Sequence, residues 1–573
     1  MSKAQKLISG IFALVFALAI APTASFAATN YDLSVNGEKF TSEKLTIQCG
    51  EGTATYDPAT QNLTLNNASI TNAVDYGGID SELTSDLTIT LQGSNQITFS
   101  DNMGIKATGS VIFRGSGSLA ISVAGETMDG ISVRGDVTMQ NTTVSVQAPA
   151  GIGVACDGSL ILDNTQLTSN GLYAGIDAAN LVVKNGCTVN ISATEQRCNA
   201  AYIHHDGSAG NINISNSAIS AKSLFPGLFA TGNMTIDGGT LQATSADNSP
   251  LWAKGNIAIK GKAKVTLNGE YPSGCNGTFT VYEAEIDAKN TSQNNIPAFD
   301  DRPTINDDFE LTYAMAVDSE GTSIDLIEHD GAEQAKEFLH LYKNIHFITG
   351  EKTATYSLPF TKVVKKGGDI APGKQEFELE IFDVGVGQIE DYSDVTITAN
   401  VATNGEGSYE GTLTIQGPKS QMDNITAEGF CVREKNTGIA NWTYSDAVYQ
   451  IFCDNSATDN QGTAQPSFEV FPVELVATDN GEFYKKTQDT PVDAMTFENV
   501  YTEKTAPAED TKPTEGSDLN ANTKSAVDAV EDKAAAVTPH TGDANMPIVA
   551  IAALLIAASA LLASTLTTKK RQE

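Results

Sequence analysis

The sequence predicts an all-β chain, in which a right-handed parallel β-helix precedes an antiparallel β-sandwich. A pair made of glycine and an aliphatic residue recurs every 21 to 26 residues, which indicates stacked repeats. A second apolar column lies two residues after the first, the period of one strand face. After Tyr356 the repeat gives way to long alternating strands separated by Gly, Asn and Asp, which predicts the sandwich. The repeat pairs at this spacing are Gly78-Ile79, Gly104-Ile105, Gly130-Ile131, Gly151-Ile152 and Gly175-Ile176, and Gly227-Leu228 and Pro250-Leu251 continue in the same phase.

Each repeat holds three short strands with one apolar face, so the chain must coil until like residues stack on like. The copy around Ala201-Tyr202-Ile203, followed by His204-His205, is irregular and is interpreted as a coil with an insertion. The segment from Glu285 to Gly350 is expected to close the open end of the coil as a cap. The predicted β-helix with its cap spans residues 28–350.

Residues 1–27 have the pattern of a signal peptide. Lys3 and Lys6 precede the apolar run Ile8 to Ile20, and Ser25-Phe26-Ala27 provides a small-x-small cleavage site. A membrane anchor is the alternative, but the apolar run is short for a bilayer.

The net charge of -35 argues against nucleic acid as a partner. Ca²⁺ is possible, but no regular Asp ladder supports it, and no cofactor is predicted. No CxxC or Cys/His cluster has zinc spacing, so no metal site is predicted and the pair His204-His205 is assigned to a turn.

Of the seven cysteines, Cys431 and Cys453 flank a predicted hairpin and could form a disulfide. Three others are expected inside coils as small apolar residues, namely Cys156, Cys187 and Cys198.

Residues 31 to about 290 resemble the carbohydrate-binding β-helix domains common on Gram-positive surface proteins. The resemblance rests on Tyr31-Asp32-Leu33, the segment Gly52 to Pro58, and the phrases Gln61 to Leu65 and Asp86 to Ile89. It implies that this head domain binds an extracellular glycan or a host surface ligand, as a non-enzymatic adhesin or binding protein.

Some proteins with this fold are polysaccharide lyases or hydrolases, so an enzyme is the alternative function. Cleavage of a glycan would need carboxylates stacked in neighbouring coils on one outward column. The expected column shows no adjacent acidic pair, which favours binding over catalysis. It reads Asp80, Lys106, Ser132, Gly153, Asp177, Phe229 and Trp252.

Phe229 and Trp252 are the candidate ligand-binding residues. They fall in neighbouring coils of the outward column, which places their rings about 4.8 Å apart along the stacking direction. The alternative is that the segment Glu285 to Gly350 folds over this end and buries both rings.

Residues 351–503 are predicted to form an antiparallel, Ig-like β-sandwich. Three phrases in it resemble the streptococcal pilin isopeptide-linked domain, namely Phe360 to Val364, Phe430 to Glu434 and Phe497 to Tyr501. The resemblance implies an isopeptide bond between Lys362 and Asn499, with Glu434 assisting. A lysine buried in a core has a lowered pKa and becomes a neutral nucleophile, which suits this chemistry. The alternative is that the three are ordinary strand residues.

Residues 504–537 are too polar to bury a core and are expected to be a disordered linker that spans the wall. Residues 538–573 resemble a sortase sorting signal, as a variant of the LPxTG type. The motif holds Pro539, Thr541 and Gly542, and the uncharged run Ile548 to Leu566 is long enough for a transmembrane helix. The resemblance implies a secreted protein that sortase joins to peptidoglycan on the cell surface. A simple C-terminal membrane anchor is the alternative.

Overall fold

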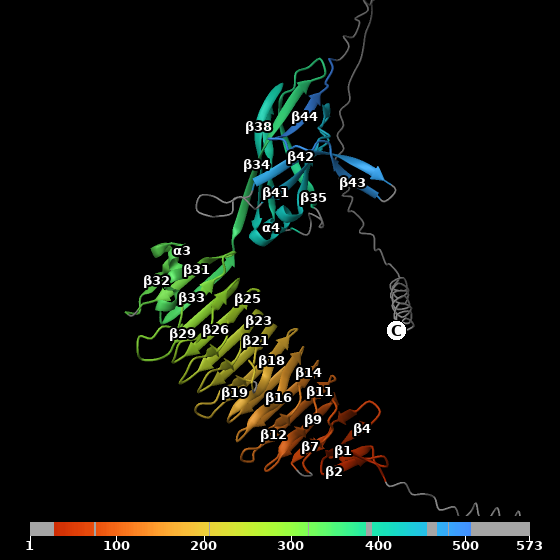
Figure 1. Cartoon of the computed structure of the whole chain (residues 1–573), viewed down its shortest axis with the longest axis vertical. Helices are drawn as coiled ribbons and strands as arrows, with labels where there is room; N and C mark the ends of the chain where they lie inside the picture. The colour runs from red at the N-terminus through yellow and green to blue at the C-terminus, as the bar shows by residue number, and fades with distance from the viewer. Residues whose placement is uncertain are drawn as a thin grey trace, which may run out of the picture. The chain divides into compact units, whose positions relative to one another are not determined.

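The computed structural model describes residues 28–73, 76–204, 207–318, 320–384, 392, 394–454, 467–478 and 481–505 (Figure 1). It is all-β, and a parallel β-solenoid of about ten turns forms its N-terminal part. Among the described residues, no helix is long and apolar enough to cross a membrane. The predicted signal peptide, linker, sorting motif and transmembrane run lie outside the described residues.

The solenoid begins with antiparallel strands. β1 (Asn30–Val35) pairs with β2 (Glu38–Thr41) and also with β7 (Gly77–Ser81), which belongs to the first full coil. β3 (Thr46–Cys49), β4 (Gly52–Asp57) and β5 (Asn62–Asn66) form a meander. These strands cover the open end of the first coil, which would otherwise expose unpaired backbone groups.

The coils then stack in parallel along three faces, which we number in chain order. Face 1 consists of β7, β10 (Met103–Ala107), β13 (Ile131–Val133), the start of β16 (Ile152–Asp163), the start of β18 (Ala174–Lys184), β20 (Ala201–Ile203), β22 (Leu228–Ala230), β24 (Leu251–Ala253) and β27 (Gly274–Cys275).

Face 2 consists of β8 (Leu87–Gln92), β11 (Val111–Arg114), β14 (Val137–Gln140), the ends of β16 and β18, the starts of β21 (Ile212–Ser223) and β23 (Met234–Ser245), β25 (Ile257–Lys260), β28 (Phe279–Val281) and β30 (Thr304–Ile305). Face 3 consists of β6 (Ser69–Ile70), β9 (Ser94–Phe99), β12 (Ser118–Val123), β15 (Thr143–Ala148), β17 (Gln166–Gly171), β19 (Thr188–Ala193), the ends of β21 and β23, β26 (Ala263–Gly269) and β29 (Ala284–Asn290).

The register on face 1 corrects the repeat predicted from sequence. Val154, not Ile152, pairs with Ile131 on one side and Ile176 on the other, so the repeat glycine of that coil is Gly153. The stretch from Gly151 to Val154 offers the glycine-aliphatic pair twice in succession, and the pattern alone cannot choose between the two. The irregular copy also belongs to the ladder, because Ala201 pairs with Ile176 and with Leu228.

The repeat glycines allow face 1 to pack closely inside the coil. A Cβ atom on Gly130 would lie 2.1 Å from Val146 Cγ1 on face 3 and 2.7 Å from the carbonyl oxygen of Gly153 in the next coil. On Gly104 it would lie 2.4 Å from Ile121 Cγ2. Because only glycine lacks this atom, the position repeats as glycine in most coils.

The C-terminal end of the solenoid carries three further antiparallel strands and short helices. β33 (Asn344–Glu351) pairs with β29 and with β31 (Phe309–Val317), and β31 also pairs with β32 (Ser323–Asp325). Helices α2 (Leu326–Asp330) and α3 (Ala332–Phe338) and the 3-10 helix η1 (Leu339–Leu341) bury Leu326, Ala335 and Leu339. An antiparallel strand therefore ends the parallel stack at this side as well.

The second domain contains two sheets and helix α4 (Lys419–Glu428). The five-stranded sheet has the order β36 (Thr396–Thr398), β38 (Gly407–Pro418), β34 (Thr353–Lys366), β44 (Met495–Tyr501) and β40 (Trp442–Thr443). The six-stranded sheet has the order β37 (Asn400–Asn404), β35 (Lys374–Val384), β39 (Phe430–Glu434), β41 (Val448–Asp454), β42 (Ser467–Thr478) and β43 (Gly481–Lys486).

Both sheets contribute to one buried cluster, with Phe360, Leu413 and Phe497 from the first and Val432 and Ile451 from the second. All pairs within the sheets are antiparallel except that of β34 with β44, the first and last strands, which run parallel. The purely antiparallel arrangement expected from the sequence is therefore wrong at this one pair. A parallel pair needs a long connection, and here the rest of the domain supplies it.

Candidate functional site

The outward column of face 1 contains three aromatic residues from successive coils. Tyr202 pairs with Phe229, and Phe229 pairs with Trp252, so the predicted neighbours do lie side by side. All three are half-buried. The strand pairing therefore forms an aromatic ladder, consisting of Tyr202, Phe229 and Trp252.

Ring contacts extend the aromatic ladder. The Tyr202 and Phe229 ring centroids lie 5.5 Å apart at 34°, and the His204 ring lies 4.3 Å from that of Tyr202. The Lys254 ammonium lies 5.9 Å from the centre of the Phe229 ring. Beyond the ladder the column continues with Gly274, where a Cβ atom would lie 3.3 Å from Trp252 Cζ3, so the glycine leaves room for the indole.

The sequence prediction missed Tyr202 and His204 because the insertion after Ile203 hid their register. It also placed Gly153 in the outward column, where the structure has Ala155. Ala201 and Ile203 are apolar and lie two residues apart, so strand alternation alone would have placed Tyr202, the residue between them, on the outward side. His205 lies outside the described residues.

One carboxylate, Asp177, lies beside the aromatic ladder, and a second, Asp129, is close enough to Asp177 to be affected by its charge. Asp177 pairs in register with Tyr202, and its Oδ1 lies 3.1 Å from His204 Nε2. Burial raises the pKa of Asp177, and the facing His204 partly offsets this rise. Burial also raises the pKa of Asp129, with the Asp177 charge adding to it. Such groups can accept hydrogen bonds from hydroxyls, and a carboxyl with a raised pKa can also hold a proton.

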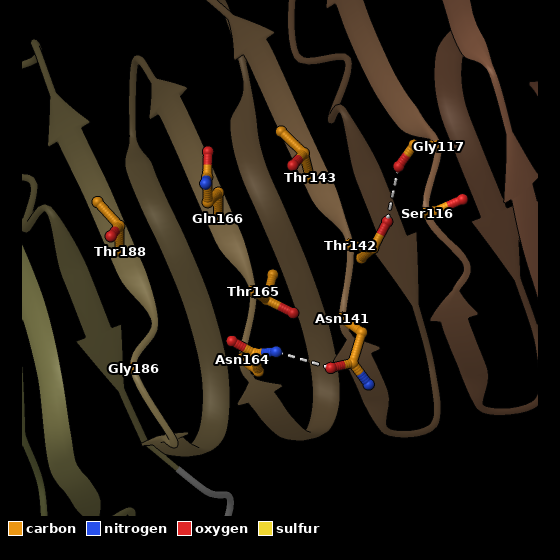
Figure 2. Close-up of a pocket in the computed structure, with 10 residues that line it drawn as sticks. All are labelled: Ser116, Gly117, Asn141, Thr142, Thr143, Asn164, Thr165, Gln166, Gly186 and Thr188. Carbon is orange, nitrogen blue, oxygen red and sulfur yellow. Dashed lines mark hydrogen bonds between the residues drawn. The ribbon is translucent and has the colours of Figure 1, made fainter. Parts of the chain in front are cut away.

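A polar groove of about 260 Å³ lies along the turn between faces 2 and 3. Figure 2 shows Thr143, Gln166 and Thr188 lying one per coil along it. Asn141 and Asn164 occupy the turn with φ of 51° and 48°, a left-handed conformation that asparagine tolerates. The Asn164 amide donates to Asn141 Oδ1 at 2.8 Å, and the Thr142 hydroxyl donates to a backbone carbonyl. These polar groups hold the turn, and no aromatic ring lines the groove.

The structure brings together the three residues of the second domain that the sequence singled out. Lys362 on β34 and Asn499 on β44 lie on neighbouring parallel strands, and Glu434 ends β39 of the other sheet. Lys362 Nζ donates to Glu434 Oε1 at 2.6 Å, and Asn499 Nδ2 donates to the same oxygen at 2.9 Å. The backbone N–H of Ser445 donates to Glu434 Oε2 and to Asn499 Oδ1.

Lys362 and Asn499 are fully buried and Glu434 is 5% exposed. Burial lowers the pKa of Lys362 from 10.5 to about 8, although its contact with Glu434 opposes the change. The Phe377 ring lies 4.3 Å from the ammonium and replaces water on that side. A buried lysine with a lowered pKa beside a side-chain amide is the arrangement that amide exchange requires.

The predicted disulfide between Cys431 and Cys453 is not formed in the structure. β39 and β41 do form an antiparallel pair, but Cys431 lies opposite Gln450. Cys453 is three residues further along β41, which places it on the opposite face of the sheet. Of the cysteines expected inside coils, Cys156 and Cys187 are buried and Cys198 is half-buried.

Among the described residues there is no group of three or more His, Cys, Asp or Glu side chains that could hold a metal ion. The sorting-signal residues Pro539, Thr541 and Gly542 lie outside the described part of the chain.

Comparison with known proteins connects the solenoid to carbohydrate binding. Residues 46–269 match the model of a family described as carbohydrate-binding domain-containing protein. The search of curated proteins found no match to the chain. The matched stretch runs from β3 to β26 and contains the whole aromatic ladder. The expectation of a carbohydrate-binding β-helix thus has support from both the solenoid and the family match.

Proposed function

We propose that this protein is a glycan-binding surface protein, whose solenoid head binds sugar along the aromatic ladder. The observation that carries the proposal is the ladder of Tyr202, Phe229 and Trp252 on one outward column, within the stretch that matches a carbohydrate-binding family. Partly exposed aromatic side chains that follow one another at the strand spacing offer apolar surface to successive sugar rings. Asp177 and His204 beside them offer partners for hydroxyl groups.

A glycan array probed with residues 28–505 and with matched variants tests this proposal. Trp252→Ala should weaken binding several-fold, since aromatic contacts are worth about 0.5 to 1.5 kcal/mol each. Tyr173→Ala is the control, because Tyr173 is an exposed aromatic residue of the head that lies outside the outward column. Equal binding by the Trp252→Ala variant and the wild type would rule out the ladder as the site.

Cleavage of a glycan is a second candidate function, and Asp129 and Asp177 favour it. Burial raises the pKa of both carboxyls, and the Asp177 charge adds to the rise at Asp129, which is a pattern found at general acids. A reducing-sugar and unsaturated-product assay on the array's best ligand tests this function. Activity that is lost in Asp129→Asn and Asp177→Asn would establish an enzyme, and no product from the wild type would exclude one for that ligand.

We further propose that the second domain, an Ig-like sandwich of the pilin type, forms a Lys362–Asn499 isopeptide bond. Neutral Lys362 Nζ attacks Asn499 Cγ, a new N–C bond forms, and the Cγ–Nδ2 bond breaks. Glu434 contacts both nitrogen atoms, so it can carry one proton from the amine to the leaving group, which departs as ammonia.

Intact-mass measurement of residues 28–505 should give a value lighter than the sequence by one ammonia. A wild-type chain at full mass contradicts the proposal.

Finally, we propose that the chain is secreted and that sortase attaches it to peptidoglycan. The proposal rests on the sequence pattern around Pro539, Thr541 and Gly542 and on the apolar and basic segments that follow.

A further inference from the structure

A small cavity at the first coil is separate from the aromatic ladder. It measures about 210 Å³ and is lined by Asp32, Leu33, Ser34, Lys39, Asp80 and Glu82. This is less than the roughly 300 Å³ at the low end for drug-sized ligands, so the cavity suits one small polar ring.

Asp80 is the residue that marks this cavity as a binding site. It is only 5% exposed, and neither of its carboxylate oxygens has a hydrogen-bond partner. Lys106 Nζ lies 3.5 Å from Asp80 Oδ1 as an ion pair, but this contact and the nearby Tyr76 backbone only partly offset the effect of burial, because the pKa of Asp80 stays raised. A buried carboxylate without hydrogen bonds is costly, and a ligand that donates to it would remove that cost.

The lining of the cavity contains both hydrogen-bond donors and acceptors. Lys106 also lies 3.5 Å from Glu82, and Lys39 adds a second ammonium to the lining. Lys106 also lies 5.2 Å from the centre of the Tyr76 ring, and Tyr76 is 64% exposed. Vicinal hydroxyl groups both donate and accept, so a polyol ring can satisfy such a lining, with its apolar side against an aromatic ring.

The position of the cavity indicates which part of a glycan it would take. Asp80 and Lys106 belong to the same outward column of face 1 as the aromatic ladder. β1 closes this column, because its Ser34 pairs antiparallel with Asp80. A site closed on one side by a crossing strand accepts a chain end more readily than a chain interior.

We propose that the Asp80 cavity binds the terminal neutral pyranose of a glycan through vicinal hydroxyl groups. This inference rests on the proposed glycan-binding function and adds a second, separate site on the same column. The site lies seven coil steps from Trp252, or about 34 Å at the strand spacing. A divalent cation is the less favoured occupant, because two ammonium groups line or border the cavity and the described residues hold no metal-ligand cluster.

The test uses methyl pyranosides of glucose, galactose, mannose and N-acetylglucosamine, titrated into residues 28–505 and followed by ligand-detected NMR. At least one should bind the wild type, and Asp80→Asn should weaken it at least five-fold. Tyr76→Ala should weaken it about three-fold and, because that side chain is largely exposed, should leave the fold intact. Asp163→Asn is the matched control, since Asp163 also pairs with a lysine of the next coil but lines no cavity described above.

The outcomes separate this inference from the wider proposal. Trp252→Ala should leave pyranoside binding at the Asp80 cavity unchanged, and a polysaccharide that binds only through the ladder should lose affinity in that variant alone. The inference is overturned if no pyranoside binds, or if Asp80→Asn and Tyr76→Ala both bind as tightly as the wild type. In a last experiment, calcium is titrated alone. Calcium binding that is lost in Asp80→Asn would identify the occupant of the cavity as a cation and not a sugar.

Discussion

Lys362 makes the stability of the second domain depend on pH whenever its amine is free. The folded domain lowers the pKa of this lysine from 10.5 to about 8, chiefly through burial. Below pH 8 the Lys362 ammonium is charged in the folded state, so the full cost of burying that charge lowers the stability of the domain. Between pH 8 and 10.5 the unfolded state binds a proton that the folded state does not, so the free energy of unfolding rises with pH.

Asn499→Ala cannot form the isopeptide bond and keeps the amine free, so its unfolding midpoint in urea should rise from pH 7 to about pH 10. Trp252→Phe in the background leaves Trp442 of the second domain as the only tryptophan to follow by fluorescence. The double variant Lys362→Met, Asn499→Ala is the control and should lack this rise. The same rise in both variants would assign the pH dependence to another group.

At the residue scale, the sequence predicted which side chains lie together where a short phrase fixed their neighbours. Lys362, Glu434 and Asn499 were each found within a strand phrase, and the structure places their side chains in hydrogen-bond contact. Tyr202 was missed because an insertion broke the period. Asp80 was noted only as a column residue, because the cavity beside it depends on β1, which crosses from outside the repeat.

At the scale of elements, the repeat glycine sets how closely face 1 can approach face 3. Gly130→Ala would force the new Cβ against Val146 Cγ1, 2.1 Å away, and against a backbone carbonyl of the next coil. Backbone cannot rotate away as a side chain can, so we expect a loss of about 1 to 3 kcal/mol in the stability of the head. The melting of the head transition, followed by Trp252 fluorescence in a Trp442→Phe background, measures this loss.

Ser132→Ala is the matched control for this prediction, since Ser132 lies two residues after Gly130, on β13, and points outward. It should change the midpoint little. If Gly130→Ala melts at the same temperature as Ser132→Ala, the close approach of the two faces is not what selects glycine.

The elements themselves were largely predictable, whereas their register was not. Apolar alternation at a spacing of two identified the strands, because burial of one face is a local property of the sequence. Register depends on which residue of the next coil lies opposite. Gly151 and Gly153 are each followed by an aliphatic residue, so the local sequence does not show which of them is the repeat glycine. The parallel pair of β34 and β44 was equally hidden, since its two strands are separated by the rest of the domain.

At the scale of the whole molecule, a bond between the first and last strands would change how the second domain carries force. β34 enters the domain from the head side of the sequence and β44 leaves it toward the predicted linker. A covalent bond between Lys362 and Asn499 would join the two strands directly, so a pull on the termini would load the bond and not the sheets. That arrangement would suit a domain placed between the proposed glycan-binding head and the proposed wall anchor.

The proposed attachment to the cell wall depends on Thr541. If sortase cleaves between Thr541 and Gly542, the threonine carbonyl becomes the point of attachment to peptidoglycan, and the apolar run after it only holds the precursor in the membrane. Thr541→Ala should therefore move the protein from the purified wall fraction to the membrane or the medium, as measured by blotting each fraction for the head. Thr538→Ala, a change at the first motif position, tests how far this variant motif tolerates substitution there. A Thr541→Ala protein that still co-purifies with peptidoglycan after boiling in detergent would show that the attachment does not pass through this residue. A wild-type protein found only in membranes would favour the simple membrane anchor instead.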